Sequence, residues 1–110
     1  STQAKTLFPY TTLFRSMKVT EPAVDLAAAL AVASFVKRSP IPQDTVVIGE
    51  LGLAGEVRRV TGIARRLAEA KRLGFARAII PAGTDEKLPA GIRAMRVNNL
   101  GEAISAGAGR

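Results

Sequence analysis

Few residues in this sequence are of the types that usually carry catalysis. The chain of 110 residues contains no histidine and no cysteine. Histidine is the most common general base, and cysteine supplies thiolate nucleophiles and metal ligands. A histidine-containing triad, a cysteine nucleophile and most zinc sites are therefore excluded. The lack of cysteine also excludes disulfide bonds, as expected of a cytoplasmic protein.

The stretch EPAVDLAAAL, residues 21–30, has the form of a helix start. Pro22 suits a first helical turn, because the N–H group that proline lacks is not needed there. Some hydrolases place a nucleophile directly after such a proline. Here that residue is Ala23, whose methyl group can neither attack a carbonyl nor take up a proton. Either a nucleophile has been lost at this position or none was ever required.

Three carboxylates could take part in acid–base chemistry. Glu50 and Glu56 flank the glycine-rich segment GELGLAG, but no nucleophile or metal partner accompanies them. We therefore interpret them as solvated side chains of a hairpin. Asp25 lies in the first turn of the expected helix, where the helix dipole favours a negative charge, and we assign it a positional role. GELGLAG does not match the P-loop pattern, so no nucleotide site is expected there.

The strongest chemical signal is positive charge. The chain has 16 basic and 9 acidic residues, a net charge of +7, and the part after residue 16 retains +5. Arginine suits phosphate, so a polyanionic partner is one interpretation and a solvated helix face with ion pairs is the other. The densest basic group contains Lys71 and five arginines that we predict to contact DNA, namely Arg58, Arg59, Arg65, Arg66 and Arg72.

The expected mode of DNA contact follows from the aromatic residues. After residue 16 only Phe35 and Phe75 are aromatic, and we place both in the core. Stacking on bases is therefore not expected. Binding would use the phosphate backbone and would be weak, sensitive to salt and without sequence preference.

Hydrophobic patterning predicts the elements that must position these residues. We expect helices at residues 23–36, at 62–73 and from about Asn99, strands at 45–49, 76–81 and 92–97, and a hairpin with its turn near Ala54 and Gly55. The order of elements, without strict strand–helix alternation, predicts an α+β two-layer sandwich with helices packed on one mixed β-sheet.

Two further expectations concern the helices. The helix at 23–36 is apolar on nearly every side and should be buried on nearly every side, with Thr20 or Glu21 as its cap. It is too short to cross a bilayer, which needs about 20 residues, so no membrane partner is expected. Thr61 should cap the helix at 62–73, and Gly74 should end it.

Residues 1–16 differ from the rest of the chain. They hold three of the five aromatic residues, show no helical or strand period, and lack the unbroken apolar run of a signal peptide. The segment TLFPYTTLFRS resembles translated sequencing-adapter sequence. We therefore treat residues 1–16 as foreign and residues 17–110 as the domain.

From about Met17 to its end the sequence resembles the C-terminal Lon-protease-like domain of the bacterial RadA (Sms) DNA repair ATPases. EPAVDLA, GELGLAGEVRRV and RRLAEAKRLGF carry the resemblance, in the order and spacing of the family. It implies the fold of the Lon proteolytic domain, in the ribosomal-protein-like superfamily. Lon proteases use a serine nucleophile and a lysine base, and the matching positions here are Ala23 and Ala64. The resemblance therefore implies a vacant dyad and no peptidase activity.

The resemblance also implies what the rest of the parent protein supplies. RadA-type proteins carry a zinc motif and a RecA-like, DNA-dependent ATPase core before this domain. ATP, magnesium and zinc are therefore expected only in upstream domains, with no cofactor and no metal in this fragment. The domain itself is expected to act as a scaffold for self-association, in a hexameric ring of the parent, and for DNA contact.

Two alternatives remain open. One is the Lon-like N-terminal domain of a Mg-chelatase-type ATPase such as ComM, which shares the hairpin pattern, although EPAVDL favours RadA. The other is an active Ser/Lys peptidase domain. The serines after residue 16 are Ser34, Ser39 and Ser105, and none stands at the start of the buried helix.

Overall fold

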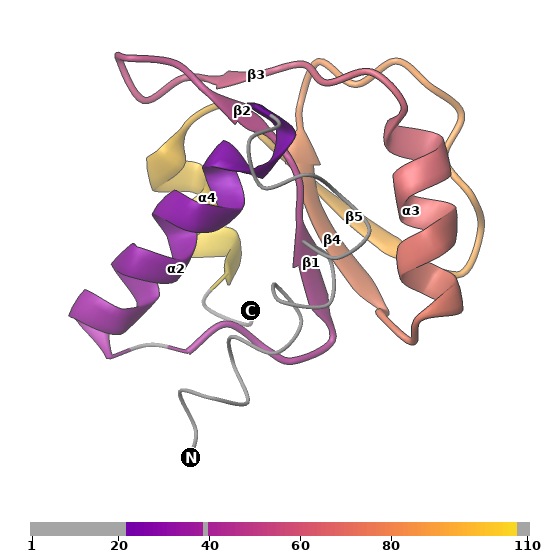
Figure 1. The fold of residues 1–110 in the computed structure, drawn as a ribbon, viewed down its shortest axis with the longest axis horizontal. Helices are drawn as coiled ribbons and strands as arrows, with labels where there is room; N and C mark the ends of the chain where they lie inside the picture. The colour runs from indigo at the N-terminus through magenta and orange to yellow at the C-terminus, as the bar shows by residue number, and fades with distance from the viewer. Residues whose placement is uncertain (1–21, 39, 108–110) are drawn as a thin grey trace.

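The computed structural model describes residues 22–38 and 40–107. Residues 1–16 and the cap expected at Thr20 or Glu21 lie outside this part. The described elements are the 3-10 turn η1 (Pro22–Val24) and then α2 (Asp25–Lys37), β1 (Thr45–Val47), β2 (Glu50–Leu51), β3 (Val57–Arg58), α3 (Ile63–Arg72), β4 (Arg77–Pro81), β5 (Arg93–Val97) and α4 (Leu100–Gly107) (Figure 1). The predicted order of helices and strands is confirmed.

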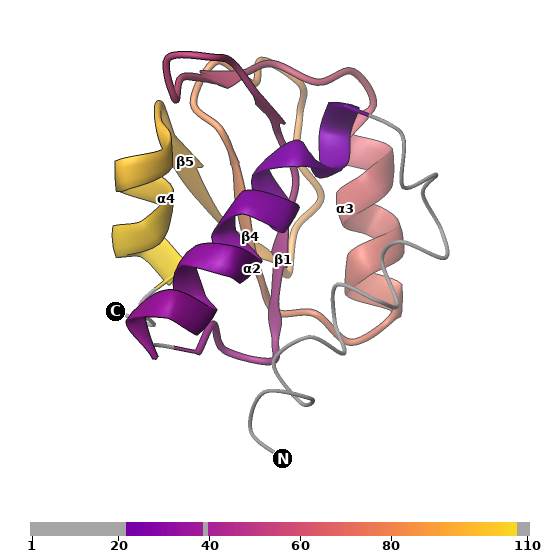
Figure 2. The same ribbon diagram turned by 60° about the vertical axis from the view of Figure 1, so that its left-hand side comes forward.

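The three longer strands form one parallel sheet in the order β1-β4-β5, and β2 and β3 form a separate antiparallel pair. Helices α2 and α4 lie on one side of the parallel sheet and α3 lies on the other (Figures 1 and 2). The mixture of α and β structure is confirmed, but the predicted two-layer packing on a single mixed sheet is wrong. The crossover from β1 to β4 places α3 on one face of the sheet, and α2, which precedes β1, and α4, which follows β5, cover the other face.

Two hydrophobic clusters fill the two sides of the sheet. Because successive strand residues point to opposite faces, Ile80 of β4 joins the α3 side and Ile79 joins the α2 and α4 side. The α3 side also holds Val46, Ile48, Ile63, Leu67, Ala70, Phe75 and Ala78. The other side also holds Leu26, Ala27, Leu30, Ile41, Val47, Val97 and Ala103. The expected core position of Phe75 is confirmed.

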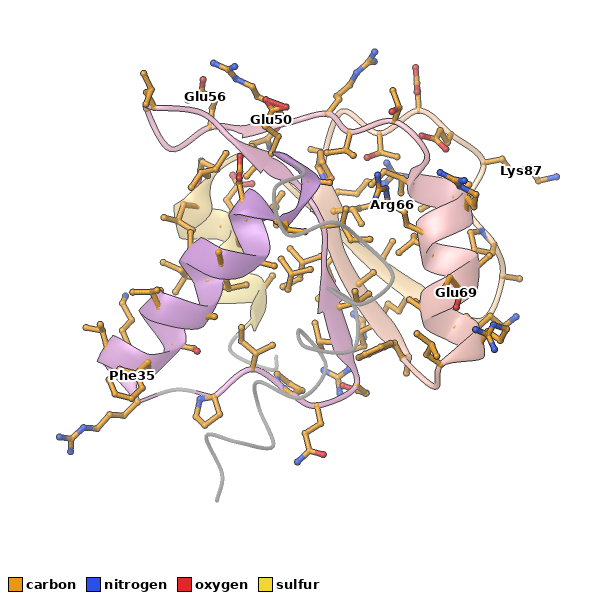
Figure 3. All side chains as sticks on the ribbon, viewed as in Figure 1. Phe35, Glu50, Glu56, Arg66, Glu69 and Lys87 are labelled. Carbon is orange, nitrogen blue, oxygen red and sulfur yellow. The ribbon has the colours of Figure 1, made fainter. Side chains whose placement is uncertain are left out.

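Helix α2 is buried on one face only. Leu26, Ala27 and Leu30 are buried against the sheet, whereas Val32, Phe35 and Val36 are 64%, 65% and 71% exposed. Phe35 stands near the far end of the helix and outside the core (Figure 3). The predictions of a fully buried helix and of a core Phe35 are therefore wrong. The apolar composition of a helix does not indicate on how many faces other elements pack against it. Helix α2 packs against the sheet on one face, and its other face is exposed to solvent.

The helix ends combine local and more distant contacts. Asn99 stands before α4, where its Oδ1 accepts the N–H of Glu102 at 2.8 Å, and Glu102 Oε1 accepts the N–H of Asn98 at 2.8 Å. Asn99 is thus the N-cap of α4, and the Glu102 side chain bonds the residue before the cap. Gly74 follows α3 with φ of 100°, which only glycine adopts without strain, and its predicted role is confirmed. Among the described residues no helix combines the length and apolar character needed to cross a membrane.

The central strand generates a stability prediction. Ile79 is fully buried in the middle of β4, so Ile79→Ala should lower the free energy of unfolding by roughly 2–5 kcal/mol through lost burial and the cavity left behind. Leu53, which is fully exposed at the turn of the β2–β3 hairpin, is the matched control, and Leu53→Ala should change stability by less than about 0.5 kcal/mol. Urea denaturation followed by circular dichroism measures both. Equal effects of the two substitutions would contradict the assignment of the core.

Candidate functional site

Ala23 and Ala64, the positions predicted to correspond to the Lon dyad, lie in η1 and in the first turn of α3. Ala23 is 4% exposed, and its carbonyl accepts the N–H of Gly49 at 2.8 Å. Ala64 is half-buried, and it follows Ile63, which belongs to the same hydrophobic cluster as Ala23. The turn η1 and the start of α3 lie at the same end of the domain (Figures 1 and 2). Neither methyl group can act as a nucleophile or as a base.

A serine and a lysine do share a groove elsewhere in the domain. Ser34, Lys37 and Ser105 line an apolar groove of about 250 Å³ between α2 and α4. The hydroxyl of Ser34 donates to the carbonyl of Ala31 in its own helix at 2.9 Å. Throughout residues 22–38 and 40–107, no hydrogen bond joins a serine hydroxyl to a lysine amine. The groove therefore lacks the contact through which a lysine would activate a serine.

The start of α3 is capped by a residue that sequence reasoning did not identify. The carboxylate of Glu86 accepts the N–H of Ile63 at 3.1 Å with one oxygen and the N–H of Ala64 at 3.1 Å with the other. The N-cap is Gly62, with φ of 76° and no side-chain bond, so the predicted cap at Thr61 is wrong. A carboxylate at this end of the helix also complements the helix dipole. No local pattern indicated this contact, because Glu86 lies on the loop after β4.

The same contact controls the protonation of Glu86. The backbone N–H groups of Ala64 and Ile63, with a smaller contribution from Gly62, lower the pKa of Glu86 below its usual value of 4.5. These donors favour the charged carboxylate and so lower the pKa, whereas the partial removal of water from the side chain acts in the opposite direction and is outweighed. Glu86 is thus held ionised as a structural anion, and it occupies the backbone donors that an external anion would otherwise bind.

The predicted pair of hairpin carboxylates divides into two different environments. The carboxylate of Glu56 accepts a hydrogen bond from the N–H of Ala54 at 3.1 Å and forms an ion pair with Arg58 at 3.0 Å. The same side chain occupies the space that a Cβ atom would fill at Gly52. Hydrogen bonds from its own backbone and from Arg58 lower the pKa of Glu56. A lowered pKa makes Glu56 a poor proton donor near neutral pH, which supports its interpretation as a hairpin residue. Glu50 is half-buried on β2 (Figure 3).

The predicted DNA-contact arginines are divided between two ends of α3. Arg58 and Arg59 lead from β3 toward α3, and Arg65 and Arg66 reach back over Gly62. Arg72 lies at the last position of α3, about 10 Å along the helix axis from Arg65 and Arg66 at 1.5 Å per residue, and it pairs with Glu69. The fold therefore places Arg65 and Arg66 in the first turn of α3, Arg58 and Arg59 on β3 and the loop before the helix, and Arg72 at the other end of the helix.

Several of these arginines already hold carboxylate partners in the domain. Arg59 pairs with Asp85 at 3.4 Å, and the side chains of both residues are mostly exposed. The pair of Arg58 with Glu56 is also open to solvent. Ion pairs of this kind are weak and screened by salt. A phosphate group could therefore replace these carboxylates as the partner of the same arginines.

A second pocket lies beside this basic group but has a different character. It encloses about 290 Å³ and is lined by Arg59, Val60, Thr61, Thr84, Asp85 and Glu86. Two carboxylates face one arginine there, so the pocket itself does not favour an anion. Residues 22–38 and 40–107 hold no cluster of histidine, cysteine, aspartate and glutamate that could bind a metal ion.

Comparisons with known proteins identify the family of this chain. The family model described as subunit ChlI of Mg-chelatase matches residues 15–84. The chain belongs to this family. It is 45% identical over 95 residues to the DNA repair protein RadA of Mycobacterium tuberculosis (strain ATCC 25618 / H37Rv), covering 86% of this chain and 20% of that protein. It is 47% identical over 90 residues to the DNA repair protein RadA of Escherichia coli (strain K12), covering 81% of this chain and 20% of that protein. The resemblance to RadA is confirmed.

The similarity covers only a small part of each RadA protein. The chain spans about one fifth of the length of the RadA proteins that it matches. The activity and partners of a whole RadA protein are therefore matters of proposal for this chain. A family model named after a Mg-chelatase subunit also agrees with the alternative of a Mg-chelatase-type ATPase domain.

The cap of α3 generates a prediction on pH. Because folding lowers the pKa of Glu86, its contribution to stability is complete above the unfolded value of about 4.3 and is lost as the pH falls through the folded value. Glu86→Gln should therefore destabilise the domain at pH 7, and its difference from the wild type should shrink toward pH 3. Urea denaturation across this range measures the difference. Glu50→Gln removes the same charge from the hairpin and serves as control, and a similar profile for both variants would contradict the role of Glu86.

Proposed function

We propose that this chain is a non-catalytic, Lon-like domain that serves a RadA-type DNA repair ATPase as a scaffold and a DNA contact in the cytoplasm. The observation that carries the proposal is the extended similarity to RadA, combined with alanine at both dyad positions, Ala23 and Ala64. A Lon-like fold is supported by the resemblance of the hairpin and of the segments around both alanines.

The argument against peptidase chemistry rests on the missing groups. Amide hydrolysis by a Ser/Lys dyad needs an oxygen nucleophile and a neutral amine within hydrogen-bond reach. Ala23 and Ala64 supply neither group, and Ser34 in the groove between α2 and α4 is bonded to its own helix. Lys71 donates to the carbonyl of Ala90 at 2.7 Å on the opposite side of the sheet from that groove. A scaffold that keeps the fold without these groups explains this arrangement.

The proposed DNA contact is electrostatic and involves few residues. Arg65 and Arg66 lie in the first turn of α3, and Arg58 and Arg59 lie before it on β3 and the following loop. Each of these guanidinium groups is proposed to hold a backbone phosphate. Four or five phosphate contacts are few, and no aromatic side chain is available to stack on bases. The affinity for DNA is therefore proposed to be weak and to fall steeply as the salt concentration rises. In the parent, several copies in a ring would present several such surfaces to one duplex, so that weak contacts add up.

The other parts of the proposal concern the parent protein. We propose that ATP, magnesium and zinc belong to domains outside this chain, and that the chain itself carries no cofactor. We also propose that the domain contributes to self-association in a hexameric parent. A second candidate is the N-terminal domain of a Mg-chelatase-type ATPase, which the family match favours. Flanking genomic sequence separates the two, because a zinc motif and an ATPase core before this domain indicate RadA, and an ATPase core after it indicates the alternative.

A salt titration of DNA binding tests the contact surface. The double substitution Arg59→Ala and Arg65→Ala should weaken binding of duplex DNA of any sequence and reduce the slope of log K against log salt by about 2, at roughly one unit per lost phosphate contact. The matched control is Arg77→Ala with Arg93→Ala, which removes the same charge. These two arginines are neighbours across the strands at the starts of β4 and β5. Fluorescence anisotropy measures all three proteins. Equal effects of the two double variants, or tight binding insensitive to salt, would contradict the phosphate model.

A protease assay tests the absence of catalysis. The chain should not cleave an unfolded substrate such as casein beyond the rate of a buffer blank, whereas an active Lon protease in the same assay should. Ser34→Ala and Ser105→Ala should leave this result unchanged, because neither hydroxyl is activated. Cleavage by the wild type that either substitution abolishes would overturn the proposal.

A further inference from the structure

The tip of the β2–β3 hairpin presents one apolar side chain to solvent. Leu53 is fully exposed there. A single exposed leucine is common on protein surfaces and indicates nothing by itself. This one is held in a defined position, because the N–H of Gly52 donates to the carbonyl of Glu56 at 2.8 Å and the N–H of Gly55 donates to the carbonyl of Gly52 at 3.0 Å. The turn thus displays Leu53 as a fixed apolar knob.

The groove between α2 and α4 is apolar and large enough to accept such a side chain. It encloses about 250 Å³, and Leu30, Ile41 and Ile104 form much of its wall. A cavity of about 150 Å³ already holds a group of the size of benzene. The buried hydroxyl in its lining, on Ser34, is bonded to the carbonyl of Ala31 at 2.9 Å. The groove therefore offers apolar surface and requires no hydrogen bond from its occupant.

The knob and the groove lie at opposite ends of the layer that α2 and α4 form. The hairpin is tied to the starts of both helices, since the N–H of Leu26 donates to the carbonyl of Gly49 at 3.0 Å and the N–H of Leu100 donates to the carbonyl of Gly55 at 2.9 Å. The groove is lined by the C-terminal halves of the same helices. Figure 1 shows the hairpin at the top and the end of α2 at the bottom left. The knob therefore cannot enter the groove of its own chain, but two copies can meet head to tail.

Charge at the two surfaces is complementary. The carboxylate of Glu56 accepts the N–H of Ala54, the residue after Leu53, so a negative charge stands beside the knob. Its ion pair with Arg58 is open to solvent and can exchange partners. Lys37 is exposed and lines the groove, and the described part of the chain gives it no ion-pair partner. A knob seated in this groove would bring a carboxylate to the ammonium group of Lys37.

We propose that Leu53 of one copy of this chain inserts into the groove between α2 and α4 of the next copy, head to tail. The proposal rests on the self-association that the proposed function assigns to the domain, and it adds the two surfaces. A contact between two different surfaces leaves a free knob at one end and a free groove at the other. It can therefore be repeated, and it closes into a ring where the rotation between successive copies allows, as a hexameric parent requires.

The size of the contact sets its expected strength. One leucine and its turn bury much less surface than a standard interface, so the isolated chain should associate weakly, with a Kd of about 10 to 500 µM for each contact. In the parent, linkage to other associating domains would raise the effective concentration of knob and groove.

The first test places a charge on the knob. Analytical ultracentrifugation of the wild-type chain from about 10 µM to 1 mM should show species that grow beyond a dimer as the concentration rises. Leu53→Asp should be monomeric at every concentration. The matched control is Val32→Asp, the same kind of change at a residue that is 64% exposed on the outer face of α2, and it should leave the association intact. Circular dichroism of each variant checks that the fold is kept.

The second test separates the two halves of the contact. Ser105→Arg places a long charged side chain at an exposed position of the groove and should also be monomeric. An equal mixture of Leu53→Asp and Ser105→Arg should form a dimer of one copy of each and nothing larger. The first variant offers an intact groove to the intact knob of the second, and the pair then has no further working surface. Only a head-to-tail contact predicts extension of the wild type and a limit at the dimer in the mixture.

Each remaining outcome overturns the proposal. Association that survives Leu53→Asp, or that Val32→Asp abolishes, uses another surface. A wild-type chain that stops at a dimer uses a two-fold contact, and a mixture that stays monomeric shows that the knob and the groove are not partners. In these cases the self-association of the domain stands and only the proposed contact falls. A wild type that is monomeric to 1 mM removes both, and the DNA salt titration still tests the DNA contact, because Arg59 and Arg65 belong to neither surface.

Discussion

The burial of β4 on both of its faces is the constraint on which the rest of this domain depends. Its residues alternate between two hydrophobic clusters, so a helix layer is required on each side of the sheet. A chain of this size buries only a modest core, and here that core is divided into two clusters. Because β4 contributes side chains to both clusters, each of them depends on this strand. The positions of η1 and α3, which carry Ala23 and Ala64, follow from this arrangement.

The end of the domain that carries η1 and the start of α3 is stabilised by core packing and by a helix cap. Ala23 packs into the core, and the first N–H groups of α3 are satisfied by Glu86. Glu86 connects the loop after β4 to the start of α3, and so it keeps this end of the helix in place without any contribution from Thr61. A buried methyl needs no hydrogen-bond partner, and the cap satisfies the backbone groups at the start of α3, so this end of the domain leaves little polar burial uncompensated.

The ion pairs near α3 hold arginine side chains in place but leave them exposed to solvent. Arg58 and Arg59 each contact a carboxylate, yet these contacts are open to solvent and cost little to exchange. The start of α3 thus combines arginines that can reach phosphate with a pocket whose acids would repel it. This combination agrees with a partner that lies across the surface along its backbone, and it disagrees with a small anion held inside the pocket.

The sequence by itself determined the order of the elements, the hairpin turn, the glycine that ends α3 and the start of α4 near Asn99, because each depends on local backbone chemistry. It also determined that Ala23 and Ala64 cannot support a Ser/Lys mechanism, since this follows from residue type alone. Only the tertiary structure decided that the sheet is parallel with helices on both faces, that Phe35 and one face of α2 are exposed, and that Glu86 caps α3. These features depend on contacts between segments far apart in the chain, and a local hydrophobic pattern states that a residue is apolar without stating what lies against it.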